Sequence, residues 1–127
     1  MMNLMTDEQD RKVRMAAVKI FSNLCTEWSI LPEQSPGLLG FADVEELFAW
    51  QNGELDRVNN DKALEMLSHL MAIYKLLHQI FANQKQANAW LLKSNSGFNG
   101  DSALNVIQEN GLNGGSVVRR YLEQQLG

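Results

Sequence analysis

The chain has 127 residues, of which 45% are hydrophobic, so it is long enough for one domain with a hydrophobic core. Its formal net charge is −4, which disfavours a general nucleic-acid binder, because such proteins normally present a basic face. We expect the single cysteine, Cys25, to be a buried, inert thiol in a reducing cytoplasm. The N-terminus lacks the apolar segment of a signal peptide and no stretch is long enough to span a bilayer, so a cytoplasmic protein outside the membrane is expected.

The first expected helix follows a predicted N-cap at Thr6 and runs to about Ser29. Its apolar residues recur three and four positions apart, which places them on one helical face. They are Val13, Ala16, Ala17, Ile20, Phe21, Leu24 and Trp28. The cations Arg11, Lys12, Arg14 and Lys19 lie mostly off that face. We interpret them as solvated, with contact to phosphate groups as the alternative.

A helix-turn-helix layout is predicted for the next segment. A short helix from about Pro32 to Gly40 is interrupted by Pro36 and Gly37, and a third helix covers residues 44–52 after an N-cap at Asp43. Its expected apolar anchors are Val44, Leu47, Phe48 and Trp50. The third helix also carries several carboxylates, and Gln51 is its candidate for reading base edges. Because carboxylates repel phosphates, this chemistry counts against direct DNA reading.

The second half begins with the longest helix after the first, which we expect to be capped by Asn60 or Asp61 and to run to about Ala82, apolar on two sides. Further N-caps are predicted at Asn83, Ser102 and Ser116. Gly111, Gly114 and Gly115 are expected to form the turn before the last helix. In the polar loop 94–101, Phe98 is expected to dock into a core.

No pattern of catalytic residues is present. His69 and His78 lack further ligands at metal spacing, no carboxylate pair lies in an apolar setting, and no nucleophile motif occurs. We therefore expect no metal, no cofactor and no enzyme activity. An all-helical chain of this kind is best interpreted as a binding module.

Residues 90–122 resemble the toxin-binding domain of the Xre/MbcA/ParS antitoxin family. The resemblance is carried by an ordered set rather than by one motif: Trp90-Leu91, Asn95, Phe98, Gly100, Ser102, Leu104, Val106-Ile107, Gly111 and the closing Val118-Arg119-Arg120-Tyr121-Leu122. Upstream, the segments 17–21, 38–40 and 73–78 together with Trp50 occur in the order of the family's helix-turn-helix region. Ala103 stands where members often have proline, and Asp101 where the loop is often basic.

The resemblance implies an all-α fold in which an N-terminal helix-turn-helix-like bundle (residues 1–60) is joined by a long central helix to a small C-terminal toxin-binding unit (residues 61–127 with that helix). It implies an antitoxin of a type II toxin–antitoxin pair. The partner would be a RES-domain toxin that degrades NAD⁺, and the C-terminal unit would cover its active site. Family members commonly form homodimers.

The expected toxin-binding residues are Arg119, Arg120, Tyr121, Glu123, Gln124, Asn99 and Asp101. We expect Val118 and Leu122 to pack in the chain's own core instead. An alternative function is repression of the chain's own promoter, for which the DNA-binding candidates are Arg11, Lys12 and Gln51. Another alternative is a solitary adaptor that uses the same docking unit on a different partner.

Overall fold

A computed structural model describes residues 7–127 of the chain. These residues fold into seven α-helices and two short 3-10 helices without a β-sheet, so the predicted all-α class is confirmed. The elements are α1 (Asp7–Glu27), α2 (Ser35–Leu38), α3 (Val44–Gln51), α4 (Arg57–Ile80), α5 (Gln84–Ala89), η1 (Trp90–Leu92), η2 (Ser96–Phe98), α6 (Ala103–Asn110) and α7 (Leu112–Leu126).

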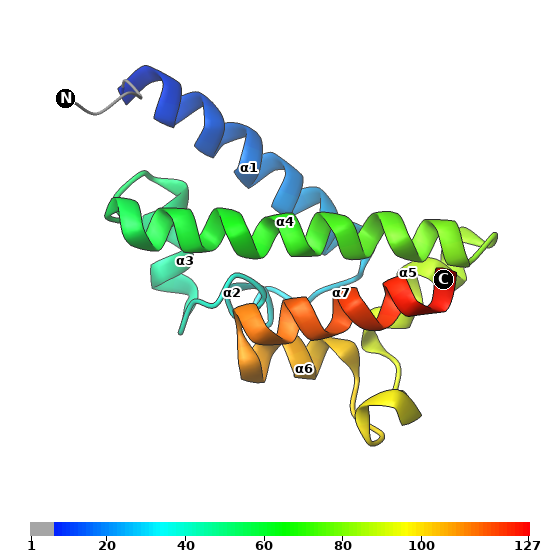
Figure 1. The fold of residues 1–127 in the computed structure, drawn as a ribbon. Helices are drawn as coiled ribbons and strands as arrows, with labels where there is room; N and C mark the ends of the chain where they lie inside the picture. The colour runs from blue at the N-terminus through cyan, green and yellow to red at the C-terminus, as the bar shows by residue number, and fades with distance from the viewer. Residues whose placement is uncertain (1–6) are drawn as a thin grey trace.

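Helix α4 lies at the centre of the molecule. Figure 1 shows α1 on one side of it and α7 on the other, with α6 on the outer side of α7. The helix contacts α1, α5 and α7, and this is why its apolar residues extend over two sides. Its buried side chains are Ala63, Met66, Leu67, Leu70, Ile73 and Leu77.

Local capping sequences place most helix starts. The predicted caps are confirmed at Asp43, Asn83 and Ser102, whose side chains accept hydrogen bonds from the backbone N–H three residues on. The predicted start of α4 was wrong, since Asp56 caps it by accepting from the N–H of Asn59. The predicted cap Thr6 lies outside the described residues.

The prediction for the short second helix was wrong in its start and in the role of Pro36. Helix α2 begins only at Ser35, so Pro36 occupies its first turn, where a missing N–H costs little. The proline therefore starts the helix and does not interrupt it. Gly40 follows the helix with a φ of 80°, a left-handed conformation that favours glycine.

The prediction that three glycines form the last turn was also wrong. Only Gly111, with a φ of 59°, lies at the junction, and Ser116 is not a cap because α7 already begins at Leu112. Gly114 and Gly115 are buried inside α7. A Cβ on Gly114 would overlap the backbone of α6, lying 2.8 Å from the Cα of Ile107, and one on Gly115 would lie 3.2 Å from the Cβ of His69 on α4. These glycines let three helices approach closely.

Several predicted core residues are instead exposed. The side chains of Val13, Val44 and Phe48 are 44%, 37% and 53% exposed, whereas Leu47 and Trp50 of the same predicted set are buried. Cys25 is half-buried, and burial raises the pKa of its thiol to about 12, which leaves little thiolate at neutral pH.

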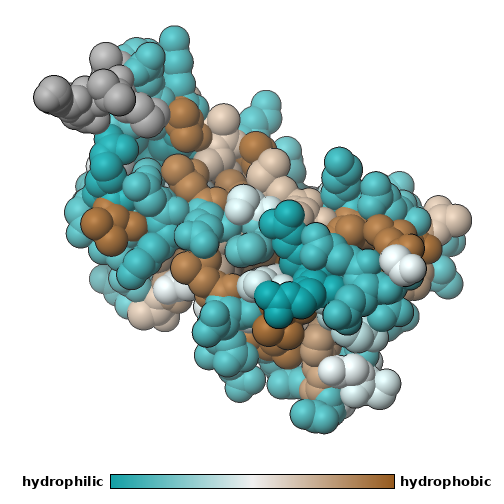
Figure 2. All heavy atoms as spheres, in the orientation of Figure 1, coloured by the Kyte–Doolittle hydropathy of each residue, from teal (hydrophilic) through white to brown (hydrophobic). Residues whose placement is uncertain are grey.

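Figure 2 shows hydrophobic side chains at the surface between α1 and α4. A groove of about 530 Å³ there is lined by Ile20, Leu24, Met71 and Tyr74 among others.

Candidate docking surface on the C-terminal helical unit

The loop between η1 and α6 is ordered by its own hydrogen bonds. The backbone N–H of Asn95 donates to the carbonyl of Asp101 at 3.0 Å, and that of Gly100 donates back to the carbonyl of Asn95 at 2.9 Å. The hydroxyl of Ser94 donates to the Gly100 carbonyl at 2.6 Å. Ser94 and Ser102 form an isolated β-bridge that closes the base of the loop. The loop is therefore a fixed projection, and Figure 1 shows it extending away from the helices.

Three aromatic rings attach this loop to the last helix. Phe98 lies with its ring centroid 5.0 Å from that of Tyr121 and 6.2 Å from that of Trp90. Trp90 and Tyr121 are stacked, with centroids 6.2 Å apart and planes inclined by 22°. We call Trp90, Phe98 and Tyr121 the aromatic cluster. It confirms that Phe98 docks against the core, because each of these rings packs on the buried residues.

Gly97 is required by this arrangement. A Cβ at that position would lie 2.7 Å from Cε1 of Tyr121, well inside van der Waals contact. Its N–H donates to Oδ1 of Asn95 at 2.7 Å, which holds the η2 turn under the tyrosine ring. The loop backbone and the tyrosine thus fix each other's position.

Helix α7 buries one face and leaves another uncovered. Val118 and Leu122 are 0% and 1% exposed, which confirms their predicted place in the chain's own core. Val117, Arg120 and Gln124 are exposed and fall three or four positions apart, so they share one stripe. We call Val117, Arg120 and Gln124 the α7 stripe. It runs beside the helix face that carries Tyr121.

The predicted toxin-binding residues differ in how available they are. Arg120, Glu123, Gln124 and Asn99 are exposed. Tyr121 is half-buried in the aromatic cluster, so at most part of its ring is open to a partner. Whether these residues bind a toxin stays a prediction.

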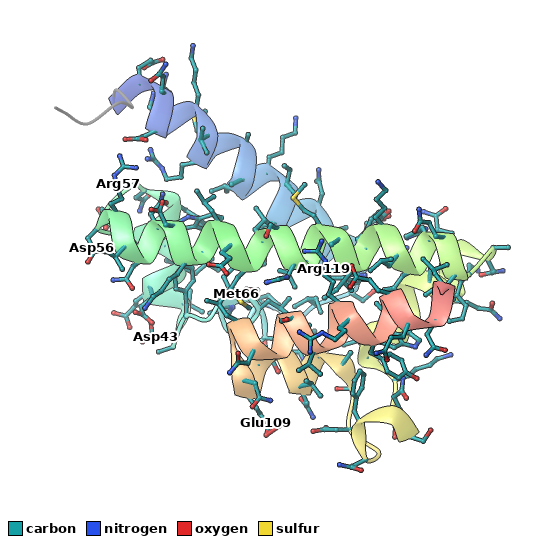
Figure 3. The ribbon with its side chains drawn as sticks, viewed as in Figure 1. Asp43, Asp56, Arg57, Met66, Glu109 and Arg119 are labelled. Carbon is teal, nitrogen blue, oxygen red and sulfur yellow. The ribbon has the colours of Figure 1, made fainter. Side chains whose placement is uncertain are left out.

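Three of the predicted residues already have partners inside the chain. Arg119 forms an ion pair with Glu123 at 3.5 Å, and Figure 3 shows Arg119 on the side of α7 toward α4. Oδ1 of Asp101 accepts hydrogen bonds from the N–H of Ser102 at 3.1 Å and from Nδ2 of Asn105 at 2.8 Å. The Asp101 carboxylate therefore stabilises the start of α6, where negative charge is favourable.

The predicted DNA-binding residues do not converge on one surface feature. Arg11 is bound to Glu8 at 2.8 Å and lines a recess between α1, α3 and α4. Gln51 lines two other hollows of the surface, both of which also contain Ser22 of α1. Lys12 is exposed on α1 and lines neither the recess nor these two hollows. The recess also contains Arg14, one of the cations expected off the apolar face of the first helix, and Arg57 of α4, which no sequence pattern indicated. They lie in different helices, so no periodicity joins them.

The other titratable side chains form local contacts. The hydroxyl of Tyr74 donates to Oε1 of Glu27 at 2.9 Å, and burial together with this carboxylate raises the pKa of the tyrosine. The ring of His78 is tilted by 40° to that of Tyr74, with centroids 4.3 Å apart, and its Nε2 lies 3.0 Å from Oδ1 of Asn88. Within residues 7–127 we find no group of three or more histidine, cysteine or acidic side chains placed to hold a metal ion. No helix in that range has the length and apolar character needed to cross a membrane.

Fold and surface together define an all-α protein with an ordered loop and an uncovered helix face at its C-terminal end. The chain is 28% identical over 114 residues to the uncharacterized protein y4oB of Sinorhizobium fredii (strain NBRC 101917 / NGR234). The match covers 88% of this chain and 85% of that protein. No family model matches the chain, and no solved structure matches it significantly.

Proposed function

We propose that the chain is the antitoxin of a type II toxin–antitoxin pair and that its C-terminal unit docks on a RES-type, NAD⁺-degrading toxin. The proposal rests on the resemblance of residues 90–122 to the Xre/MbcA/ParS toxin-binding domain. The observation that carries it further is that α7 presents an uncovered face beside an ordered loop. A surface that is already ordered loses little conformational entropy when it binds.

The α7 stripe has the residue types of a protein interface. Val117 is 46% exposed and supplies an apolar contact, while Arg120 supplies a long, planar cation. Arginine and aromatic residues are enriched where interfaces lose most affinity on truncation, and Tyr121 adds a ring edge beside the stripe. A guanidinium also suits a cleft that accommodates the pyrophosphate of NAD⁺. Arg120 is a better candidate than Arg119 for this contact because Arg119 is already paired with Glu123.

The test is to co-express the chain with the protein encoded by the neighbouring reading frame and to measure growth and cellular NAD⁺. Wild type should preserve NAD⁺, whereas Arg120→Glu combined with Val117→Asp should let it fall. We expect binding to weaken by about 30-fold or more, as for hot-spot residues. Lys19→Glu, an exposed charge reversal on α1, is the matched control and should protect as wild type does.

Two results would contradict this function. One is a double variant that has wild-type helicity and still binds and protects. The other is a neighbouring protein that leaves NAD⁺ intact. If that protein nevertheless binds the α7 stripe, the result supports the alternative function as a solitary adaptor.

Homodimer formation stays a prediction, which the mass of the purified chain in solution will decide.

The second candidate function is repression of the chain's own promoter. The short α2, the tight turn and α3 follow each other as in a helix-turn-helix, and this layout favours it. The exposed side chains of α3 disfavour it, because they include Glu45, Glu46 and the large apolar Phe48. A gel shift with the upstream DNA at low salt decides between the two, and we expect no shift.

A further inference from the structure

A recess of about 480 Å³ lies between the N-terminal half of α1, the end of α3 and the start of α4. Its wall contains three arginines, Arg11, Arg14 and Arg57, and a single carboxylate, Asp10. Nothing in the proposed docking function uses this place, because the α7 stripe lies on a different helix. Figure 3 shows Arg57 at the start of α4 on the side that faces α1.

The arginines of the recess differ in their partners. Arg11 is paired with Glu8 at 2.8 Å, and Arg57 with Asp10 at 3.0 Å, so these two charges are balanced. Arg14 has no acidic partner among the side chains that the structure describes. It is half-buried, and it lies so close to Gly53 that a Cβ there would be 2.6 Å from Cζ of the guanidinium. The recess therefore keeps one unbalanced positive charge.

Two buried donors of the recess also lack partners. Nε of Arg14 and Nε1 of Trp50 are buried without a hydrogen bond, and Trp50 is 0% exposed. A buried donor without an acceptor costs about 1–3 kcal/mol. Sites with such donors next to an unbalanced cation are suited to an oxyanion, because its oxygens accept several hydrogen bonds and its charge is neutralised.

We propose that this recess binds the phosphate group of a small phosphorylated molecule, with Arg14 as its main ligand. Arg14 supplies a planar pair of donors, and Trp50, whose indole N–H is buried without an acceptor, lines the same recess. Arg57 lies at the rim, where it is held by Asp10. The volume falls in the range of small-molecule pockets, so there is room for the group that carries the phosphate.

A small ligand fits this place better than the backbone of DNA. The donors lie inside a recess, so a phosphate must project into it, as a terminal phosphate does. A phosphodiester in a duplex has chain on both sides and contacts exposed cations instead. Beside the recess, Glu54 and Asp56 are exposed, and their charges would repel a long polyanion that extends past the rim.

The test follows the indole N–H signals of the full-length ¹⁵N-labelled protein by NMR at low ionic strength. The probes are inorganic phosphate, adenosine 5′-monophosphate, adenosine and a short DNA duplex. We expect the Trp50 indole signal, assigned with Trp50→Phe, to shift with phosphate and the monophosphate at concentrations up to about 10 mM. Adenosine should leave the signal unchanged. Stronger binding of the monophosphate than of phosphate would identify a nucleotide as the source of the group.

Arg14→Gln should weaken the binding at least about tenfold, whereas Arg120→Gln on α7 should leave it unchanged. If Arg14→Gln does not fold, Arg57→Gln serves as the second variant and should weaken the binding less. The proposal is overturned if neither phosphate nor the monophosphate shifts Trp50, or if a sodium chloride titration gives the same shift. It is also overturned if only the duplex binds, or if the folded arginine variants bind as wild type does.

Discussion

The α2–α3 pair and the α6–α7 pair have the same plan and different packing. Each is a short helix that leads through a tight turn, with a left-handed glycine at Gly40 or Gly111, into a longer helix. In the first pair, α3 leaves its Val44 and Phe48 in solvent. In the second pair, Gly114 brings α7 against the backbone of α6, and α7 also packs along α4.

This contrast in packing indicates which pair holds a fixed surface. Helix α7 is held from two sides, so the residues on its third side keep a defined geometry. Helix α3 also contacts two helices, α2 and α1, but less extensively, and it presents exposed carboxylates. The two pairs also touch each other, since Nε2 of Gln108 donates to the carbonyl of Gln34 at 2.9 Å. The α6–α7 pair is thus the better support for a docking surface.

The largest expected effect is that of Gly114→Ala. The new Cβ would overlap the carbonyl oxygen of Val106 and lie 2.8 Å from the Cα of Ile107, so the two helices must move apart. We expect a loss of about 3 kcal/mol in the free energy of unfolding, measured by urea denaturation. Asn113→Ala, an exposed neighbour in the same helix, should change it by less than about 0.5 kcal/mol. Equal stability of the two variants would show that the close approach is not needed.

An intermediate effect is expected from a pair of phenylalanines, one in each region. Phe98→Ala removes a ring that contacts Trp90 and Tyr121, so it should cost about 2 kcal/mol and speed hydrogen exchange in the loop 94–101. Phe48→Ala removes a ring that is 53% exposed and should cost less than about 0.5 kcal/mol. The comparison fails if the α3 substitution proves the more costly.

A smaller effect than that of Phe98→Ala is expected at the two N-caps, where the regions should behave alike. Asp43→Ala removes the acceptor for the N–H of Glu46 at 3.0 Å, and Ser102→Ala removes that for Asn105 at 3.1 Å. Each change should cost about 1 kcal/mol in the free energy of unfolding, as read from thermal melts. A much larger loss at either position would mean that the cap also holds tertiary contacts.

Local chemistry made much of the helical layout predictable. The caps at Asp43, Asn83 and Ser102 could be recognised because each one bonds a backbone N–H only three residues away. Helix α4 began earlier than expected because Asp56, Asn60 and Asp61 are all suitable caps. Which of them caps the helix depends on the path of the chain between α3 and α4, and this path could not be predicted from the sequence.

The candidate docking site was predictable in part. Phe98 could be expected to dock because it is a lone aromatic among turn formers. Its partners Trp90 and Tyr121 come from separate elements, so only the folded chain shows that they meet. The ion pair of Arg119 and the hydrogen bonds of Asp101 could not be predicted from the sequence either. Because of them, Arg120 and Gln124 are the members of the predicted toxin-binding set that are most accessible to a partner.

We could predict from the sequence the all-α class, the main helices and the burial of Val118 and Leu122, because caps and apolar periodicity act within a few residues of the chain. Gly114 and Gly115 look like turn residues in the sequence, and their role is apparent only in the folded chain, where α6 and α4 pack against them. The fold also brings Arg14 and Arg57 into one recess. Both outcomes depend on distances between helices far apart in sequence, and no local pattern encodes those distances.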